Sequence, residues 1–400
     1  MCRFLAFLIV KKGNKMSVMH ESNPQELEEY KLGDIVDIKE SSFNKFDITL
    51  ELQPKATYEV TIKDPYVELF SDQEKQEVNS KEIFISSFAE QRRLKGYWSR
   101  GIGKAYIDEN EVQQERKHES GDPVSSNILF NKLISSTALN VWRKIIPSAI
   151  SLMYVSGPFA KQDITDKKGN AVYIDETARK WWSLNKDCIA IRARGTLLSY
   201  LVNDFIEKKM FTQEGRLPNL VQMSVACGTA LPVMQSVLKV DIESKLILVD
   251  KDKKALSATE TLASEIGYSG QIFKYDETNI FSTDEMESLS NELDDKNLRP
   301  MIIDLMGIFE YTGNNIGVDP VNFLKSNYDM LQEDGRLIFG QMLSSRPLKD
   351  FMMGAVGWPY VETRNPEEVL GIIREAGIPL DSVKIYFPDD GIYMVVVIDK

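Results

Sequence analysis

Apolar runs and turn signals alternate regularly along the second half of the chain. Past Asp187, apolar residues at helical spacing from Ile189 to Phe205 predict a long helix. Strand-like runs and helical segments then alternate to the C-terminus, which is typical of a parallel sheet covered by helices. The strand-like runs are 221–225, 245–249, 272–275, 301–305, the end of 331–339, 383–387 and 392–398. The short turn between the last two predicts an antiparallel hairpin.

The first half of the chain has a different pattern. Residues 25–110 are expected to be rich in strands, because apolar and polar residues alternate over 46–52 and 58–62, and 82–88 is a further strand-like run. Residues 108–125 are almost entirely polar, and helical spacing follows over 126–155. The predicted division is a tail (1–24), a β-rich region (25–110), a linker and helical connector (111–186), and an α/β domain (187–400).

A turn of small residues follows the first strand of this domain. Ala226, Gly228 and Ala230 lie between an apolar run and Leu231-Pro232, and proline is favoured in the first turn of a helix. Small side chains let a ligand approach the backbone, and a helix N-terminus offers free N–H groups. A tight strand-to-helix connection without a ligand would have the same pattern.

Two acidic residues follow the next two predicted strands. Asp250 lies 22 residues after Gly228 in the chain, as the numbering shows (250 − 228), at the end of the second strand. An acid at that position can accept both hydroxyls of a ribose. Asp276 follows the third strand, where a carboxylate could accept a hydrogen bond from an adenine amino group. The carboxyl ends of parallel strands converge, so these acids are expected beside the turn.

With these motifs the chain resembles the class I S-adenosylmethionine (SAM)-dependent methyltransferases over about half its length. The resemblance rests on SVACGTA, LVDKD, YDETN, MIIDLMGIFEYT, LQEDGRLIF and the final hairpin. It implies a doubly wound, seven-stranded, mostly parallel sheet with a C-terminal antiparallel hairpin. It also implies that Ala226–Ala230 lies under the methionine end of SAM, that Asp250 holds the ribose and that Asp276 lies near the adenine. GIFEYT and WPYVETRNPEEV further resemble a bacterial small-molecule subgroup that includes proteins of 3-hydroxypalmitic acid methyl ester biosynthesis.

The sequence departs from this family at the turn. Ser224 occupies a place where the family usually has an acid, and Ala226 and Ala230 stand where it has glycines. Because alanine disfavours positive φ, the turn is expected to avoid left-handed residues. Two alternatives therefore stay open: a SAM-binding module without turnover, and a nicotinamide-dependent oxidoreductase, against which Asp276 and the closing hairpin speak.

Candidate acceptor-facing residues follow the fourth strand. Glu310 and Tyr311 are predicted as the catalytic residues, because loops at strand ends line ligand clefts in this architecture. Arg192 and Arg194 on the long helix could face the SAM carboxylate or an acidic acceptor, or could lie on a solvated face. Trp181 and Trp182 are expected to pack this part of the chain against the sheet.

Composition narrows the partners. The net charge of −12 disfavours nucleic acid, and no basic run with interleaved aromatic residues is present. The expected acceptor is a small molecule with a carboxylate or hydroxyl nucleophile, lipid-like or aromatic in view of the apolar segment 351–358. Three cysteines and two histidines predict neither a disulfide framework nor a metal site. The short apolar run 4–10 fits neither a signal peptide nor a membrane span, so a cytoplasmic protein is expected.

Overall fold

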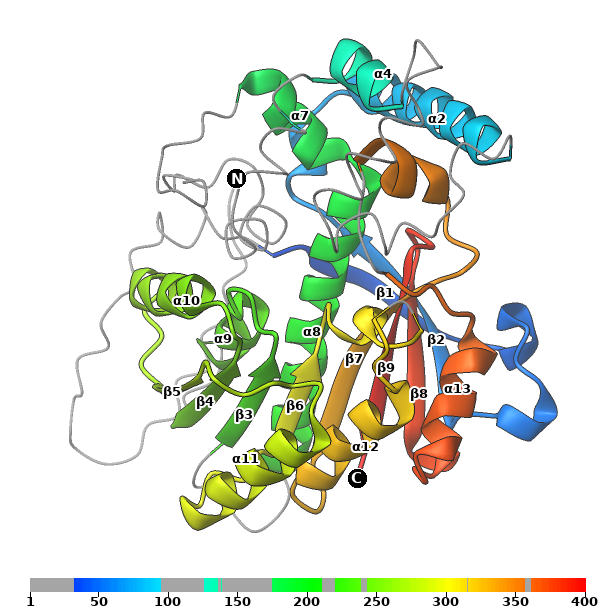
Figure 1. The fold of residues 1–400 in the computed structure, drawn as a ribbon. Coiled ribbons are helices and arrows are strands. Elements are labelled where there is room, and N and C mark those ends of the chain that lie inside the picture. The colour runs from blue at the N-terminus through cyan, green and yellow to red at the C-terminus, as the bar shows by residue number, and fades with distance from the viewer. Residues whose placement is uncertain are drawn as a thin grey trace.

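The computed structural model describes residues 32–94, 126–135, 138, 175–210, 220–238, 243–314, 316–356 and 361–400. A nine-stranded sheet in the order β1-β2-β8-β9-β7-β6-β3-β4-β5 forms its centre (Figure 1). The strands are β1 (Asp34–Ser41), β2 (Ala56–Lys63), β3 (Leu220–Val225), β4 (Ser244–Val249), β5 (Gln271–Tyr275), β6 (Ile302–Leu305), β7 (Arg336–Met342), β8 (Val383–Pro388) and β9 (Tyr393–Asp399). Strands β7, β6, β3, β4 and β5 are mutually parallel, and β9 is antiparallel to both β7 and β8. The prediction of a mostly parallel sheet with a terminal hairpin is confirmed.

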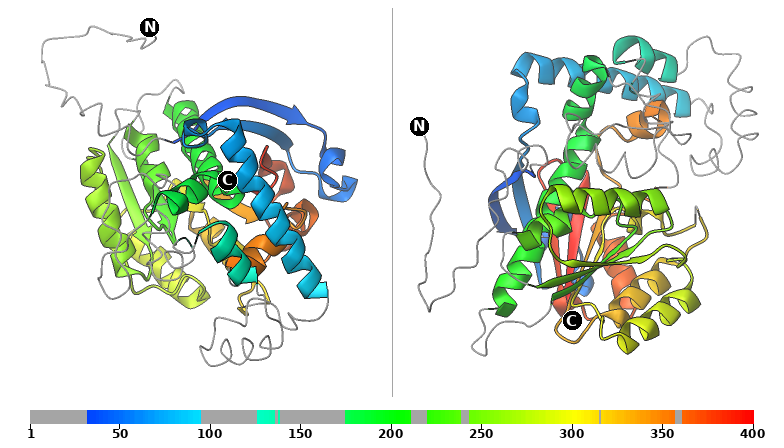
Figure 2. Two further views of the ribbon diagram at one scale, coloured as in Figure 1. Left: turned by 90° about the horizontal axis from the view of Figure 1, so that it is seen from above. Right: turned by 90° about the vertical axis from the view of Figure 1, so that its left-hand side faces the viewer.

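Helices cover both faces of this sheet, as a doubly wound fold requires. One face packs against α8 (Lys186–Met210), α9 (Leu231–Leu238) and α10 (Lys253–Glu265). The other packs against α11 (Thr283–Asp295), α12 (Pro320–Met330) and α13 (Pro366–Glu375). Apolar residues on alternate sides of the strands feed the two cores: Met223 and Ile303 join one, Leu220 and Ile302 the other. Figures 1 and 2 show α8 running along the sheet on the side opposite α11, α12 and α13.

The predicted helix signals at the C-terminal end are confirmed. Asn365 caps α13 through a capping box, in which its side chain accepts from the Glu368 N–H and the Glu368 carboxylate accepts from the Asn365 N–H. Gly377 follows α13 with φ of 77°, a left-handed conformation that glycine adopts without strain.

A third layer lies over the edge where the parallel strands end, which we call the carboxyl edge. It consists of α2 (Asp72–Leu94), α4 (Ser126–Leu133), α7 (Glu176–Leu184) and the π-helix Phe351–Val356, and we call it the cap. Its members contact one another around a separate apolar cluster, which reaches Met342 and Tyr393 at the sheet. Figure 1 shows the cap beyond the carboxyl edge, and the view from above in Figure 2 shows α2 lying across it.

The sequence pattern was misleading in parts of the first half. Residues 82–88, expected as a strand, belong to the 23-residue helix α2. Residues 46–52 contain 3₁₀ turns (Phe43–Phe46 and Leu50–Leu52) instead of a strand. The expected strand at 58–62 is β2, and the linker 108–125 and most of 126–155 lie outside the described residues.

The two N-terminal strands also belong to the main sheet. Strand β2 pairs in parallel with β8, with Tyr58 opposite Tyr386, and β1 continues the sheet beyond it. The predicted domain boundary at 187 stays a prediction, which only a shortened chain can test.

Candidate functional site

The turn that follows β3 adopts an unusual backbone. Ala226, Gly228 and Ala230 have φ of 51°, 53° and 47°, all left-handed. The expectation that the alanines would avoid this region is therefore wrong. The Ala226 N–H donates to the Val249 carbonyl at 2.7 Å, and the Ala230 N–H to the Cys227 carbonyl at 2.8 Å, so backbone bonds hold both residues in place.

This conformation is strained at the two alanines. A left-handed conformation costs an L-residue with a Cβ about 1–2 kcal/mol, and such strain persists only where the surroundings impose it. The α9 N-terminus begins at Leu231, directly after Ala230, and the whole of α9 is buried except Leu238. The turn therefore keeps the left-handed shape with methyl groups in place of glycine hydrogens.

Asp250 is directed onto this turn. It follows β4, and its Oδ2 accepts from the Gly228 N–H at 3.3 Å, while its Oδ1 accepts from the Asp252 N–H at 2.9 Å. Burial raises the pKa of Asp250, and the two N–H donors oppose that shift. The carboxylate is half-buried and fixed in direction, which suits recognition of a polar group placed over the turn.

Asp276 lies on the neighbouring strand end in a more open position. Its carboxylate pairs with Lys253 at 2.9 Å, and that hydrogen bond lowers the pKa of Asp276. The Asp250 N–H donates to the Tyr275 carbonyl at 3.2 Å, which joins the two strand ends. The structure thus brings Ala226, Gly228, Ala230, Asp250 and Asp276 to one part of the carboxyl edge.

Glu310 is deeply buried on the other part of this edge. It lies in the 3₁₀ turn Phe309–Tyr311 after β6, and its Oε1 accepts from Arg194 Nη1 at 2.6 Å. Burial raises the pKa of Glu310, while the Arg194 charge counteracts the rise. Its Oε2 is buried and has no hydrogen-bond partner among the described residues.

Arg194 reaches this position because two glycines leave room for it. A Cβ at Gly307 would come within 3.0 Å of its Nη2, and one at Gly340 within 2.9 Å of its Cδ. Its guanidinium also lies over the Tyr393 ring, 4.4 Å from the centroid. Arg192 is buried as well, paired with Asp64 at 2.6 Å, so the alternative of a solvated helix face is wrong for both arginines.

Tyr311 and the two tryptophans belong to the cap cluster. Tyr311 is half-buried and packs against that cluster. Trp181 and Trp182 are fully buried, and Trp181 meets Phe130 edge-on at 5.0 Å. They pack within the cap, which differs from the expected packing against the sheet.

Asp304 is a candidate that sequence reasoning missed. It is 4% exposed on β6, opposite Ser224 of β3 in the strand register. Burial raises its pKa to about 7, opposed by hydrogen bonds from the Ser224 side chain and the Met306 N–H. The signal was a lone carboxylate inside the apolar run MIIDL, which only the pairing of β3 with β6 connects to the turn.

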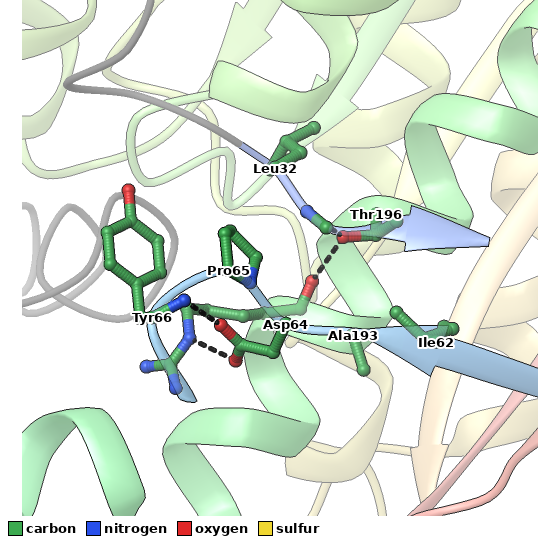
Figure 3. A pocket seen from close by; sticks show the side chains of 9 residues that line it. Leu32, Ile62, Asp64, Pro65, Tyr66, Ala193 and Thr196 are labelled. Atoms are coloured by element: carbon green, nitrogen blue, oxygen red, sulfur yellow. Dashed lines mark hydrogen bonds and ion pairs between the residues drawn. The ribbon is translucent and has the colours of Figure 1, made fainter. Parts of the chain in front are cut away.

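A small recess lies elsewhere, between the N-terminal strands and α8 (Figure 3). There Asp64 accepts from the Arg192 Nε at 2.6 Å and from the Tyr66 N–H at 2.9 Å. The Gly33 N–H donates to the Thr196 hydroxyl at 2.9 Å. These bonds fasten the ends of β1 and β2 to α8, so we regard the recess as a structural joint.

Two further observations concern metals and membranes. Among the described residues, no group of three His, Cys, Asp or Glu side chains is arranged to hold a metal ion. No helix in the described ranges has the length and apolar character needed to cross a membrane.

No protein-family model and no curated protein matches the sequence. Solved structures with a similar arrangement include a possible exported protein from Bordetella parapertussis, at 14% identity and a TM-score of 0.48, covering 81% of this chain and 96% of that one. The citrinin polyketide synthase CMeT domain has 13% identity and a TM-score of 0.43, covering 80% and 88%. Magnesium protoporphyrin IX methyltransferase from Synechocystis PCC 6803, with bound SAH, has 10% identity and a TM-score of 0.37, covering 54% and 88%. At such low identities the site geometry, and not these likenesses, bears on function.

Proposed function

We propose that the chain is a SAM-dependent methyltransferase that acts on a small-molecule acceptor. The observation that carries the proposal is the left-handed turn Ala226–Ala230 with Asp250 directed onto the Gly228 N–H. A strained turn of small residues, a helix N-terminus and a strand-end acid are the features that accommodate a nucleoside and its polar extension.

In this proposal the turn lies under the methionyl part of SAM, and Asp250 accepts the two ribose hydroxyls. Asp276 lies on the adenine side, where its pairing with Lys253 leaves it ionised and directed along the edge. The alanines were the sequence-based reason to consider a binding module without turnover. Since they adopt the left-handed shape, that reason is weaker.

SAM supplies a sulfonium whose leaving group needs no acid catalyst. An acceptor oxygen forms a bond to the methyl carbon as the carbon–sulfur bond breaks and its electron pair returns to sulfur. A hydroxyl acceptor also loses its proton, whereas a carboxylate has none to lose. The protein mainly has to align the two reactants and exclude water, which can contribute several kcal/mol, about 7–11 in favourable cases.

We propose that the acceptor lies between the carboxyl edge and the cap. Tyr311 faces that region, and the neighbouring side chains Met342, Phe351 and Met352 are apolar. This environment suits the lipid-like or aromatic acceptor expected from the sequence, and it is where a fatty-acid acceptor of the resembled subgroup would fit. Glu310 holds Arg194 at the same place, so we assign it a positioning role together with that arginine.

A cytoplasmic location remains part of the proposal. Cys188 and Cys227 are free thiols, as a reducing compartment favours. Burial raises the pKa of the Cys227 thiol, so it is an unreactive filler of the turn.

The decisive experiment is calorimetric titration with SAM, S-adenosylhomocysteine and NAD(H). We expect binding of the first two and none of NAD(H). Binding of NAD(H) without a response to SAM would contradict the proposal and favour the oxidoreductase alternative.

The acceptor class is tested with isotopically labelled SAM against metabolite, RNA and protein pools. Label in an organic-extractable product that disappears in Tyr311→Ala, with SAM binding retained, supports the assignment. Tyr200→Ala, at an exposed position on α8, is the matched control and should leave labelling unchanged. Label confined to RNA or protein would overturn the small-molecule acceptor.

A further inference from the structure

The carboxylate of Asp304 lies on the side of the sheet that α8, α9 and α10 cover. Its neighbours Ile303 and Leu305 join the opposite core, and successive side chains of a strand alternate. Ser224, its register partner on β3, likewise alternates with Met223 and Val225 of that core. The two polar side chains therefore face the same way, one residue before the turn and next to each other.

Neutral groups surround this carboxylate. It accepts from the Ser224 side chain and from the Met306 N–H, and its β7 neighbour in the register is the apolar Ile338. Arg194 of α8 acts on it through space while donating to Glu310. In the part of the chain that the structure describes, no Lys or Arg reaches Asp304 within ion-pair distance. A buried carboxylate without a cation is unfavourable, and that cost falls when a cationic ligand binds beside it.

The carboxylate also acts on the turn itself. The negative charge of Asp304 contributes to the raised pKa of the Cys227 thiol, as that of Asp250 does. Cys227 lies between the left-handed residues Ala226 and Gly228. Asp304 is therefore close enough to the turn for its charge to act on a group bound there.

We propose that Asp304 is the counter-charge for the cationic methionyl end of SAM, its α-ammonium and sulfonium groups. The inference rests on the proposed function and adds a binding residue that comes from β6. It also accounts for Ser224. Adjacent strands are about 4.8 Å apart, so a second carboxylate at 224 would face Asp304 as a like charge. The acid expected on β3 is supplied from the neighbouring strand instead.

The charge state of Asp304 gives this inference a pH signature. The groups that face it are Ser224 and Cys227 from β3 and the turn, Arg194 from α8, and the Met306 N–H from its own strand end. With a pKa of about 7, the carboxyl group in the free protein is partly protonated near neutral pH. A cationic ligand favours the ionised form, so SAM affinity should rise as the pH increases through that value and then level off.

The test compares three ligands with the full-length protein by calorimetry. SAM carries the ammonium and the sulfonium, S-adenosylhomocysteine carries only the ammonium, and 5′-deoxy-5′-methylthioadenosine carries neither. Asp304→Asn keeps the shape and removes the charge. We expect it to weaken SAM about tenfold to a hundredfold, to weaken S-adenosylhomocysteine less, and to leave methylthioadenosine unchanged. The rise of SAM affinity with pH should disappear as well.

The swap Ser224→Asp with Asp304→Ser returns the carboxylate to β3, and recovery of SAM affinity in it would support the inference. Asp250→Asn is the matched control, because loss of a ribose contact should weaken all three ligands together. Parental SAM affinity in Asp304→Asn, or an equal loss of methylthioadenosine binding, would overturn this inference alone. If the parent protein binds none of the three ligands, the proposed function fails, and this inference with it.

Discussion

The carboxyl edge of the sheet has two halves that are built differently. In the half formed by the ends of β3, β4 and β5, the polar contacts join residues that are close in the chain. Asp250 reaches Gly228 across 22 positions and Asp252 across 2. In the half formed by β6, β7 and the start of β9, under the cap, the contacts span far longer distances. Arg194 meets Glu310 across 116 positions, and Arg346 meets Asp187 across 159.

The two halves also differ in exposure. Asp276 and Lys253 form their ion pair in the open, with 33% and 71% of their side chains accessible. Arg346 and Asp187 are 1% exposed each. A site for a cofactor common to many enzymes needs short, local motifs, whereas a site for one acceptor is made by whichever distant segments the fold brings together. We propose this division of labour for the two halves, and four predictions test it.

The largest effect is expected from the buried pair of the acceptor half. Arg346→Met removes the partner of Asp187, which then lies buried without its cation, and should lower the free energy of unfolding by about 3–5 kcal/mol. Lys325→Met is the control, because its pair with Asp329 is exposed and contributes about 0.5 kcal/mol or less. Urea denaturation of both variants decides the matter: equal losses would mean that burial of charge does not distinguish the acceptor half.

The second prediction concerns cofactor affinity. Asp250→Ala should weaken SAM binding by about 1.5–3 kcal/mol, the range for losing a charged hydrogen-bond partner. Because Asp250 also accepts from two N–H groups near the turn, a stability loss of about 1 kcal/mol is expected with it. Asp276→Ala, at the exposed strand end, should weaken SAM less. Calorimetry on both variants checks the order, and an unaffected Asp250→Ala would remove the ribose assignment.

How much the sequence revealed follows the same division. The strands of the second half, the turn, Asp250 and Asp276 were all predictable, because periodicity and a turn of small residues are local signals. Arg194 was identified only as one of two open possibilities. Its burial depends on Gly307 and Gly340, which lie on two other strands, and no spacing in the sequence connects them.

The failures have physical reasons too. Residues 82–88 suggested a strand because Ile83, Phe84 and Ile85 are apolar, yet Ile83 and Phe84 are exposed on α2 and only Ile85 enters the cap core. The alanines of the turn were expected to follow their intrinsic preference. Backbone hydrogen bonds and the buried helix that follows override a preference of about 1–2 kcal/mol.

The third prediction uses a buried acid of the cap. Glu82 accepts from the Trp181 indole N–H at 3.1 Å, and burial raises its pKa from 4.5 to about 8. The folded protein therefore keeps a proton that the unfolded chain releases, so stability falls as the pH rises from 4.5 to about 8 and is constant above. Glu82→Gln stays neutral and should lack this decrease.

Above that window the glutamine variant should be more stable than the parent by about 1–2 kcal/mol, allowing for an amide N–H without a partner. Thermal unfolding over a pH series measures it. Glu77→Gln, exposed on the same helix and paired with Lys81, is the control and should leave the window unchanged. A parent whose stability does not fall across the window would show that Glu82 is not the buried acid described.

The smallest effect concerns strain in the cofactor half. Ala226→Gly relieves a left-handed alanine, worth about 1–2 kcal/mol, but adds freedom to the unfolded chain, worth about 0.4–1 kcal/mol. A net stabilisation of about 0.5 kcal/mol is expected in urea denaturation. Ala255→Gly makes the same chemical change inside α10, where glycine is unfavourable by about 1 kcal/mol, so the two variants should differ in sign. If Ala226→Gly destabilises as Ala255→Gly does, the methyl group at 226 contributes packing that outweighs its strain. If it stabilises while SAM binds more weakly, the alanine is retained because it holds the turn rigid for the cofactor.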